Sequence, residues 1–327
     1  MRWWGWLTAV YKGGVMSNLL EAGELFEDPI KGRKGKLERL RKVTAYAPEV
    51  MVKVSGSTSG AAHVKSHLDY ISRNGKVELE DERGEIVKGR VAVSALHQDW
   101  MQDAGKRTRK TRDTTSIVLS MPAGTNPISV KESVRRFAQK EFAANYQYVF
   151  AFHEDTDRPH VHLTVKTLGF DGKRLHIRKG QPQLWREKWV KELGIEGIEA
   201  EATTRAERGV VLKGIKQALI HIRERTTSKV DQAKIQEILN DALGNKKEKP
   251  WEEKIKKRQT HVRRAWLQLA DDIKREDPEL SKKMVSFVRN MPTIDTERHK
   301  LQQAIAQKMN DKSSIKGKLN NDEEQER

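Results

Sequence analysis

The sequence contains no cysteine, and this absence excludes several kinds of chemistry. Disulfide bridges, thiol catalysis and cysteine-ligated zinc all need a thiol, and the composition fits a reducing compartment. Long apolar runs are also missing, because no stretch approaches the roughly 20 residues that a membrane-spanning helix needs. Aromatic residues make up only 6% of the chain, and the 5 tyrosines are few enough to be considered one by one.

Acidic residues are outnumbered by basic ones. The 327 residues include 63 Lys and Arg against 46 Asp and Glu, which gives a net charge of +17. Such an excess attracts polyanions, because neutralising phosphates releases condensed counterions. We therefore expect a nucleic-acid partner; the alternative is a solvated basic tail or non-specific stickiness. A chain of this length holds one or two domains with a buried core.

Three regions differ in composition. Residues 1–50 form a basic N-terminal extension, residues 51–210 mix strand and helix patterns, and residues 211–327 are mostly helical. The last residues, KSSIKGKLNNDEEQER, have almost no apolar content, which predicts a disordered tail. The central region therefore carries the predicted globular fold.

Within the N-terminal extension, KGRKGKLERLRK at residues 31–42 is interpreted as a mobile arm or a short helix. Residues 1–15 are interpreted as translated leader ahead of a start at Met16, because the preceding Lys-Gly-Gly can be encoded by a ribosome-binding sequence. A genuine apolar N-terminal segment is the alternative. A signal peptide is not indicated, because no A-x-A cleavage site follows the short apolar stretch.

Alternation and helical spacing predict the elements of the central region. We expect strands in MVKVSG, TTSIVLSMP, YQYVFAFHED, HVHLTVKTL and a short KRLHI, with GKVELEDERGEIVKG as a polar hairpin or loop. We expect helices in AAHVKSHLDYISR, in ISVKESVRRFAQKEFAANY with Ser129 at its start, and in PQLWREKWVKELG. Long helical patterns follow at residues 210–242, 249–275 and 278–310.

The two central strands are joined only by Asp-Thr-Asp-Arg-Pro. That connection is too short for a parallel crossover, so the two strands are expected to pair antiparallel. The predicted fold class is therefore α+β: an antiparallel β-sheet flanked by helices, followed by a mostly α-helical C-terminal region.

The densest chemical signal is HEDTDRPHVHLTVK at residues 153–166. His160 and His162 share one face of a predicted strand, while Val161 faces the other way. His153 ends the preceding strand and can lie beside them. Three imidazoles converging from neighbouring strands predict a metal site with open coordination positions, as a catalytic metal requires. Histidines on a solvated sheet face are the alternative.

Two other residue types bear on this site. Asp155 can accept a hydrogen bond from a ligand imidazole and orient it, or simply form the turn. Tyr70 follows His63 and His67 at helical spacing, so all three share a helix face. A phenol is a poor nucleophile until a metal or base assists, and from spacing alone a buried tyrosine on an amphipathic helix is the stronger interpretation. On its strand, Tyr148 should alternate away from the face of His153.

Four segments together resemble a known family. HEDTDRPHVH resembles the metal-binding signature of HUH-type relaxases, and its surroundings resemble the MobA/VirD-type (MOBP) conjugative relaxases of the HUH endonuclease superfamily. HLDYISRNGKVELED resembles the first motif of that family and SIVLSMPAGTNPISV the second. Residues 148–162 resemble the third motif, and GIEAEATTRAERG resembles the end of the domain. The motifs occur in family order across roughly residues 52–210.

The resemblance implies a metal-dependent DNA endonuclease and transesterase, that is, a relaxase. It would nick one strand at the origin of transfer of a plasmid or mobile element by tyrosine attack, form a 5′-phosphotyrosyl intermediate and reseal the strand after conjugative transfer. The implied catalytic residues are Tyr70, Asp155 and Ser120, and the implied metal ligands are His153, His160 and His162. The implied cofactor is Mg²⁺ or Mn²⁺, although ligation by histidine alone favours softer metals such as Zn²⁺ or Co²⁺.

The resemblance also implies partners. These are single-stranded DNA of the origin of transfer, relaxosome accessory proteins and the coupling protein of a type IV secretion system. The expected location is the bacterial cytoplasm, with translocation into a recipient cell together with DNA as a further expectation. The candidate DNA-binding residues are Arg73, Lys106, Arg107, Arg109, Lys110 and Arg112.

Two alternatives remain open at this point. One is a replication initiator or transposase with the same metal and tyrosine chemistry. The order of motifs favours a relaxase, because the tyrosine motif precedes the histidine motif. The other is a non-catalytic basic DNA-binding accessory protein of the relaxosome, which loss of Tyr70 or of a metal histidine would have favoured.

Overall fold

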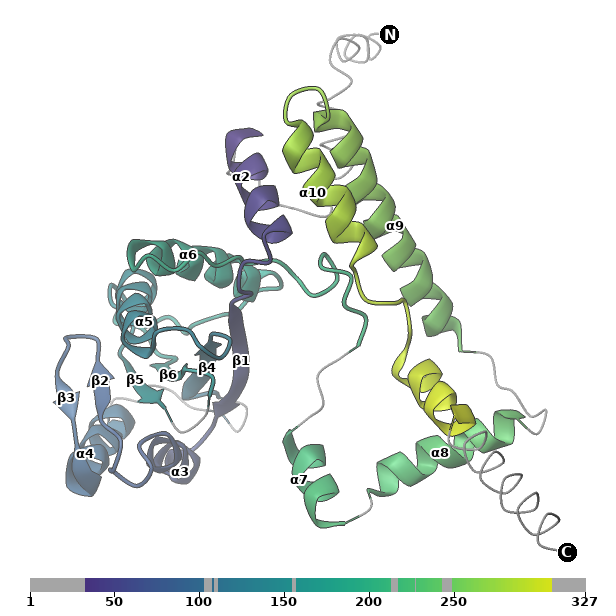
Figure 1. Ribbon diagram of the computed structural model, residues 1–327. Helices are drawn as coiled ribbons and strands as arrows, with labels where there is room; N and C mark the ends of the chain where they lie inside the picture. Colours follow the sequence, from purple (N-terminus) through teal and green to yellow (C-terminus); the bar gives the residue numbers. More distant parts are fainter. Residues whose placement is uncertain are drawn as a thin grey trace, which may run out of the picture. The chain divides into compact units, whose positions relative to one another are not determined.

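A computed structural model describes residues 33–102, 108, 111–154, 157–212, 217–226, 228–242 and 249–307. The chain divides into two compact units (Figure 1). One unit runs from Gly32 to Thr203, and the other contains the described residues from Thr204 onward. Each unit is described by itself below.

The unit from Gly32 to Thr203 is built on one sheet of long and short strands, in which every described pair of neighbouring strands is antiparallel. The described strands are β1 (Met51–Thr58), β2 (Leu79–Asp81), β3 (Ile86–Val87), β4 (Thr114–Ser120), β5 (Tyr148–His153) and β6 (His160–Lys166). Their order across the sheet is β1-β4-β6-β5-β2-β3. The predicted antiparallel pair of central strands, β5 and β6, is confirmed, and the predicted polar hairpin is β2–β3.

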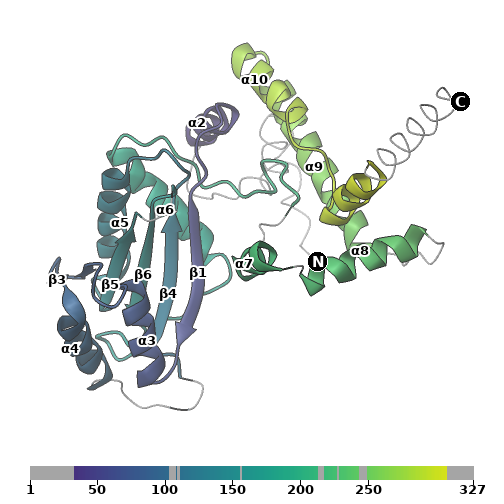
Figure 2. The ribbon, with the colours of Figure 1, turned by 60° about the horizontal axis from the view of Figure 1, so that its bottom comes forward.

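Helices cover both faces of this sheet (Figure 2). Helices α5 (Pro127–Phe142) and α6 (Gln181–Ile195) lie on one face, and helices α3 (Ala61–Ile71) and α4 (Gly89–Gln102) lie on the other. Helix α2 (Arg33–Thr44) precedes β1, and a buried ion pair of 3.2 Å joins Arg39 to Glu201 near the end of this unit. The α+β class predicted from the sequence is therefore confirmed.

The alternation of β6 explains how one strand serves both faces. Val161, Leu163 and Val165 are fully buried in the core beneath α5 and α6. His160 and His162 have the opposite parity and face the side of α3. Burial of the valine and leucine side chains fixes the register, because a slip of one residue would exchange the two faces.

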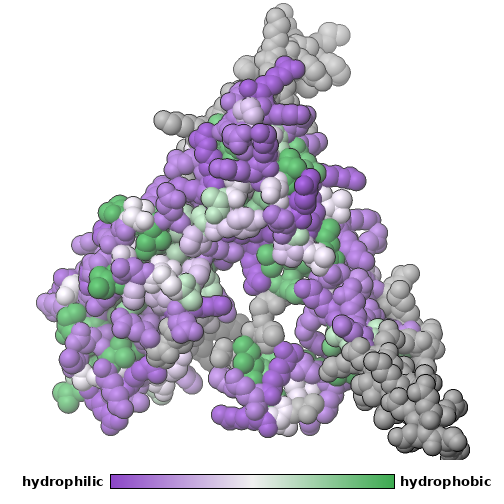
Figure 3. All heavy atoms as spheres, viewed as in Figure 1, coloured by the Kyte–Doolittle hydropathy of each residue, from purple (hydrophilic) through white to green (hydrophobic). Residues whose placement is uncertain are grey.

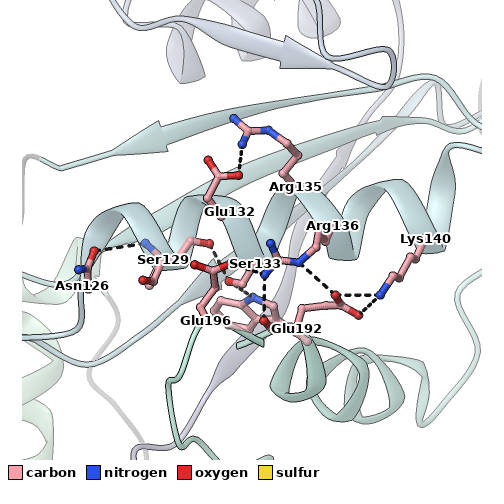
Figure 4. A network of polar contacts seen from close by, with 11 residues as sticks. Asn126, Ser129, Glu132, Ser133, Arg135, Arg136, Lys140, Glu192 and Glu196 are labelled. Atoms are coloured by element: carbon pink, nitrogen blue, oxygen red, sulfur yellow. Dashed lines mark hydrogen bonds and ion pairs between the residues drawn. The ribbon is translucent and has the colours of Figure 1, made fainter. Parts of the chain in front are cut away.

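Polar contacts hold α5 and α6 together on the core side (Figure 4). Arg136 pairs with Glu192 and Glu196, and Lys140 also pairs with Glu192. The indole N–H of the fully buried Trp189 donates to Ser133 at 3.0 Å. These contacts satisfy polar groups where two amphipathic helices meet, so the sheet is supported by a rigid layer.

Three local predictions need correction. Helix α5 begins earlier than Ser129, because Asn126 is its N-cap and accepts the backbone N–H groups of Ile128 and Ser129. KRLHI forms only the single bridge Leu168↔Arg174, because its apolar side chains pack against the core from a loop. Helix α4, with Val93 and Trp100 buried, was not expected.

The second unit is helical, as the sequence predicted. Its described helices include α7 (Gln217–Arg225), α8 (Lys229–Ala242), α9 (Pro250–Ile273) and α10 (Pro278–Arg289), and residues 297–307 are also helical. The predicted helix over 210–242 is interrupted, because the backbone N–H of Asp231 bonds to Ser228 at the start of α8. The predicted helix over 278–310 is interrupted after α10, near Pro292.

Helices α9 and α10 pack through Trp266 and Phe287, whose ring centroids lie 4.9 Å apart. In the part of the chain that the structure describes, no helix is long and apolar enough to cross a bilayer. Hydrophilic side chains dominate the face of the molecule shown in Figure 3, with small, separate hydrophobic areas. The predicted leader and the predicted tail lie outside the described residues.

Candidate metal centre and nucleophile

Three histidines converge at one end of the central strands. His153 is paired with His160 across β5 and β6, and His162 lies two residues further along β6 on the same face. One ring nitrogen from each of the three lies within 4.8 Å of the others. The structure therefore brings together the three histidines that the sequence singled out, on two rigid neighbouring strands.

Backbone carbonyl groups set the tautomers of two of these imidazoles. Nε2 of His153 donates to the carbonyl oxygen of Ile71 at 2.7 Å, and Nδ1 of His160 donates to that of Arg158 at 3.1 Å. A carbonyl oxygen can only accept, so in the neutral form of each ring the other nitrogen carries the lone pair. Such fixed imidazoles are ready to ligate a metal.

The third imidazole is held in its neutral form by its surroundings. Burial lowers the pKa of His162 to about 4, and the neighbouring histidines and Arg73 act in the same direction. Only a neutral imidazole can donate a lone pair to a metal. The donor set of three imidazoles fits a divalent cation and leaves coordination positions for another ligand.

Tyr70 lies beside this cluster on the last turn of α3. Its ring centroid is 5.9 Å from that of His162, with the rings nearly perpendicular at 87°. The neighbouring residues Leu68 and Ile71 are fully buried against the sheet, whereas Tyr70 is 65% exposed. The interpretation of Tyr70 as a buried core residue is therefore wrong, and its phenol is accessible to a large substrate.

The chain turns sharply after Tyr70. Arg73, Asn74 and Gly75 all have positive φ, and a Cβ atom on Gly75 would lie 2.5 Å from the backbone nitrogen of Arg90. Glycine is needed at that position because no side chain fits there. The turn ends α3 directly beside the histidines.

His67 anchors the same helix to the sheet, a role that sequence reasoning missed. Its Nε2 atom lies 2.9 Å from the hydroxyl of Ser116 on β4 and 2.9 Å from that of Thr164 on β6. Burial lowers the pKa of His67, so it is a neutral hydrogen-bonding group there. Its spacing three residues before Tyr70 was the only sequence signal. His63, on the same helix, is exposed.

The remaining candidate residues are placed differently. Ser120 is directly opposite His160 across β4 and β6, so it lies at the cluster. Arg73 is exposed and close enough to His162 to influence its pKa. Arg112 is exposed just before β4, so the length of that strand, on the order of 20 Å, separates it from Ser120. Five candidates lie outside the described residues: Lys106, Arg107, Arg109, Lys110 and Asp155.

The other tyrosines are less suitably placed. Tyr148 is 2% exposed in the core beneath α5 and α6, and burial raises its pKa, as do Glu82 and two further carboxylates. Its expected position away from the face of His153 is confirmed. Tyr146 packs against the same core. Tyr46 is exposed but follows α2, and Tyr11 lies outside the described residues.

Comparison with known proteins gives a consistent picture. Residues 70–196 match a family model described as "Relaxase: MobA/VirD2-like, nuclease domain". The T-DNA border endonuclease VirD2 of Rhizobium radiobacter is 31% identical over 191 residues, which cover 52% of this chain and 45% of that protein. VirD2 of Agrobacterium fabrum is 29% identical over 198 residues, which cover 54% of this chain and 44% of that protein.

One solved structure is also similar. It was described under "Molecular Basis of Vancomycin Resistance Transfer in Staphylococcus aureus", and it is 16% identical with a TM-score of 0.33, covering 48% of this chain and 99% of that one. The chain spans less than half the length of the VirD2 relatives that it matches.

Proposed function

We propose that this chain nicks one strand of DNA at an origin of transfer and later reseals it, because residues 70–196 match the model of MobA/VirD2-like relaxase nuclease domains. The proposed nucleophile is Tyr70. The observation that carries the proposal is the position of this exposed phenol, whose ring centroid lies 5.9 Å from that of His162 in the three-histidine cluster. Helix α3 and the strands β5 and β6, separate in sequence, bring the proposed nucleophile and the proposed metal ligands together.

The proposed step is an in-line displacement at phosphorus. The phenol of Tyr70 gives up its proton, and a bond forms between its oxygen and phosphorus as the bond to the 3′ oxygen breaks. The 3′ oxygen leaves with the electron pair and takes up a proton, so no proton is lost or gained overall. The products are a 5′-phosphotyrosine and a free 3′-hydroxyl. One phosphodiester replaces another, so the step can run backward and rejoin the strand.

The ligands of the proposed metal are His153, His160 and His162. A divalent cation bound there would polarise a non-bridging oxygen of the scissile phosphate and stabilise the charge that develops on it. Family membership favours Mg²⁺ or Mn²⁺, whereas a ligand set of imidazoles alone suits softer ions. Ser120, opposite His160, is proposed to contact the DNA close to the nick.

Asp155 is proposed to orient a histidine by accepting a hydrogen bond from it. The backbone carbonyl groups of Ile71 and Arg158 already orient His153 and His160 in this way, which supports the proposal that the imidazoles are held fixed. Arg73 is proposed to contact DNA phosphate, because it is exposed and lies close enough to His162 to influence its pKa. The same role is proposed, on charge alone, for Arg112 and the four basic residues before it.

At the level of domains, nicking is assigned to residues 51–210, and residues 211–327 are proposed to serve recruitment and partner contacts. The proposed partners are relaxosome accessory proteins and the coupling protein of a type IV secretion system. The chain is proposed to act in the bacterial cytoplasm and to travel into a recipient cell on the DNA that it holds.

The test is covalent trapping. Purified protein is incubated with a labelled single-stranded oligonucleotide from its element's transfer origin, with and without a divalent metal, and analysed on a denaturing gel. We expect a metal-dependent adduct and a free 3′-hydroxyl fragment. Tight binding without an adduct under any metal would instead support a non-catalytic accessory protein.

A further inference from the structure

A groove of about 490 Å³ opens beside the histidine cluster, in the unit from Gly32 to Thr203. It forms where β2 stops pairing with β5: Leu79 lies opposite Ala151, but Phe152 and His153 continue past the end of β2. His153 and Arg73 line the groove on one side, and Lys131 of α5 lines it on another. The proposed metal ligand His153 therefore forms part of the wall of the groove.

The lining of the groove includes four cations and three carboxylates. The cations are Arg73, Lys76, Lys88 and Lys131, and the carboxylates are Glu78, Glu80 and Glu154, of which Glu80 is paired with Arg135. Lys88 is engaged by Glu78 at 2.8 Å. Among the residues that the structure describes, neither Lys76 nor Lys131 forms a salt bridge, and Lys76 is exposed. The hydrogen bond from Lys88 lowers the pKa of Glu78, and the charge of Lys131 acts in the same direction. Neither Lys76 nor Lys131 is held in a salt bridge among the described residues, so both ammonium groups can contact an anion.

Apolar surface lies between these charges. Phe152 is half-buried, and Ile86 of the hairpin is 51% exposed. Val77, Leu79 and Phe150 complete the apolar part of the lining. Flat apolar surface beside cations is the combination by which proteins hold single-stranded nucleic acid, because bases stack while phosphates pair with lysine. The volume is in the range of pockets that hold small ligands.

We propose that this groove binds a nucleotide of the cleaved strand that flanks the scissile phosphate, with its base against Phe152 and its phosphate at Lys76 and Lys131. The inference rests on the proposed function and adds a subsite to it. A phosphate held at the histidine cluster brings its neighbouring nucleotide to the mouth of the groove, because His153 belongs to both. Contact with one base gives this subsite a part in the choice of cleavage site.

Photocrosslinking tests the position of the base. The Tyr70→Phe variant keeps the strand intact, and 5-iododeoxyuridine is placed at each position around the nick in turn. We expect a crosslink to the peptide containing Phe152 from one flanking position only, and its loss in Phe152→Leu, which keeps an apolar side chain. The proposal would be overturned if no position gave a crosslink to that peptide, or if all positions gave it equally.

Binding measurements test the lysines. Lys76→Ala and Lys131→Ala should each weaken binding of the oligonucleotide and lower the slope of affinity against salt by about 1, as expected for a lost phosphate contact. An oligonucleotide that ends at the scissile phosphate on the groove side should bind the variants and the parent equally. Lys191→Ala, at an exposed lysine of α6, is the matched control and should change neither quantity.

These measurements separate the two proposals. Binding and crosslinking need no cleavage, so a protein that never nicks DNA can still show the subsite. Conversely, nicking with unchanged affinity and salt slope in both lysine variants would disprove the subsite and leave the relaxase activity standing. Thermal unfolding of each variant confirms that a loss of binding is not a loss of fold.

Discussion

The carbonyl oxygen of Ile71 accepts a hydrogen bond from Nε2 of His153 at 2.7 Å. Ile71 directly follows Tyr70, so the last turn of α3 carries the proposed nucleophile and also orients a proposed metal ligand. His67, one turn earlier, fastens the same helix to Ser116 and Thr164. The position of the phenol is therefore tied to the sheet at two points on either side of it.

The nucleophile is tested by Tyr70→Phe. This change removes one oxygen from a side chain that is 65% exposed, so stability should change by less than about 0.5 kcal/mol. The covalent adduct should disappear, while metal binding and DNA affinity remain, because the imidazoles and basic residues are unchanged. Gel trapping, calorimetry and fluorescence anisotropy measure these three quantities.

Tyr46 serves as the control for this variant. Tyr46→Phe removes a phenol of similar exposure, 59%, and should leave the adduct yield unchanged. Peptide mapping of the parent adduct should place the DNA on Tyr70. DNA attached to the peptide containing Tyr146 and Tyr148 would show that the assignment of the nucleophile is wrong.

The metal centre is tested by His162→Ala. Removing a ligand should weaken divalent-metal binding by more than the roughly 100-fold that loss of a supporting hydrogen bond costs. Cleavage should fall with it, and the fold should persist, because the core side of β6 is untouched. Titration with Mn²⁺ measures the affinity, and His176→Ala, at an exposed histidine, is the control. Equal metal affinity in both variants would remove His162 from the ligand set.

His67 should make stability depend on pH. Burial lowers its pKa in the folded protein below the value of 6.5 in the unfolded chain, so the unfolded state takes up a proton first as the pH falls. The free energy of unfolding should therefore decrease as the pH drops below about 6.5 and level off below the folded pKa. His67→Ala should lack this part of the dependence, which denaturant unfolding at several pH values measures.

The same variant tests whether His67 positions the nucleophile. Losing its contacts with Ser116 and Thr164 should cost about 1–3 kcal/mol of stability, because two hydroxyls lose a partly buried partner. At a temperature where the variant is folded, the rate of adduct formation should fall while the affinity for metal and DNA stays the same. A variant that loses stability but cleaves at the parent rate would show a purely structural role.

The C-terminal region should be dispensable for nicking an oligonucleotide. The unit from Gly32 to Thr203 contains Tyr70, His67 and the three clustered histidines. A fragment of residues 16–215 should therefore fold, bind metal and form the adduct at a rate within a few-fold of the full chain. Circular dichroism and gel trapping measure this. A folded fragment without activity would place part of the active site beyond residue 215.

Local pattern was enough to predict much of this protein. Alternation in HVHLTVK identified both faces of β6, because side chains on a strand point alternately to opposite sides. The short connection between β5 and β6 dictated antiparallel pairing, and that pairing predicted that the three histidines lie close together. Helix α4 was missed because the burial of Trp100 depends on contacts with α3 and the sheet. The start of α5 was missed although Asn126 followed by Pro127 is a local signal for the start of a helix.

The sequence by itself determined the chemistry of the site: the residue types, their parity on the strands and the position of Tyr70 on a helix with His63 and His67. Only the tertiary structure decided that Tyr70 is exposed rather than buried and that His67 contacts the sheet. It alone also decided that the Ile71 carbonyl orients His153. Helical spacing defines a face, but it does not state what packs against that face, because long-range contacts between α3 and the sheet fix the rotation of the helix.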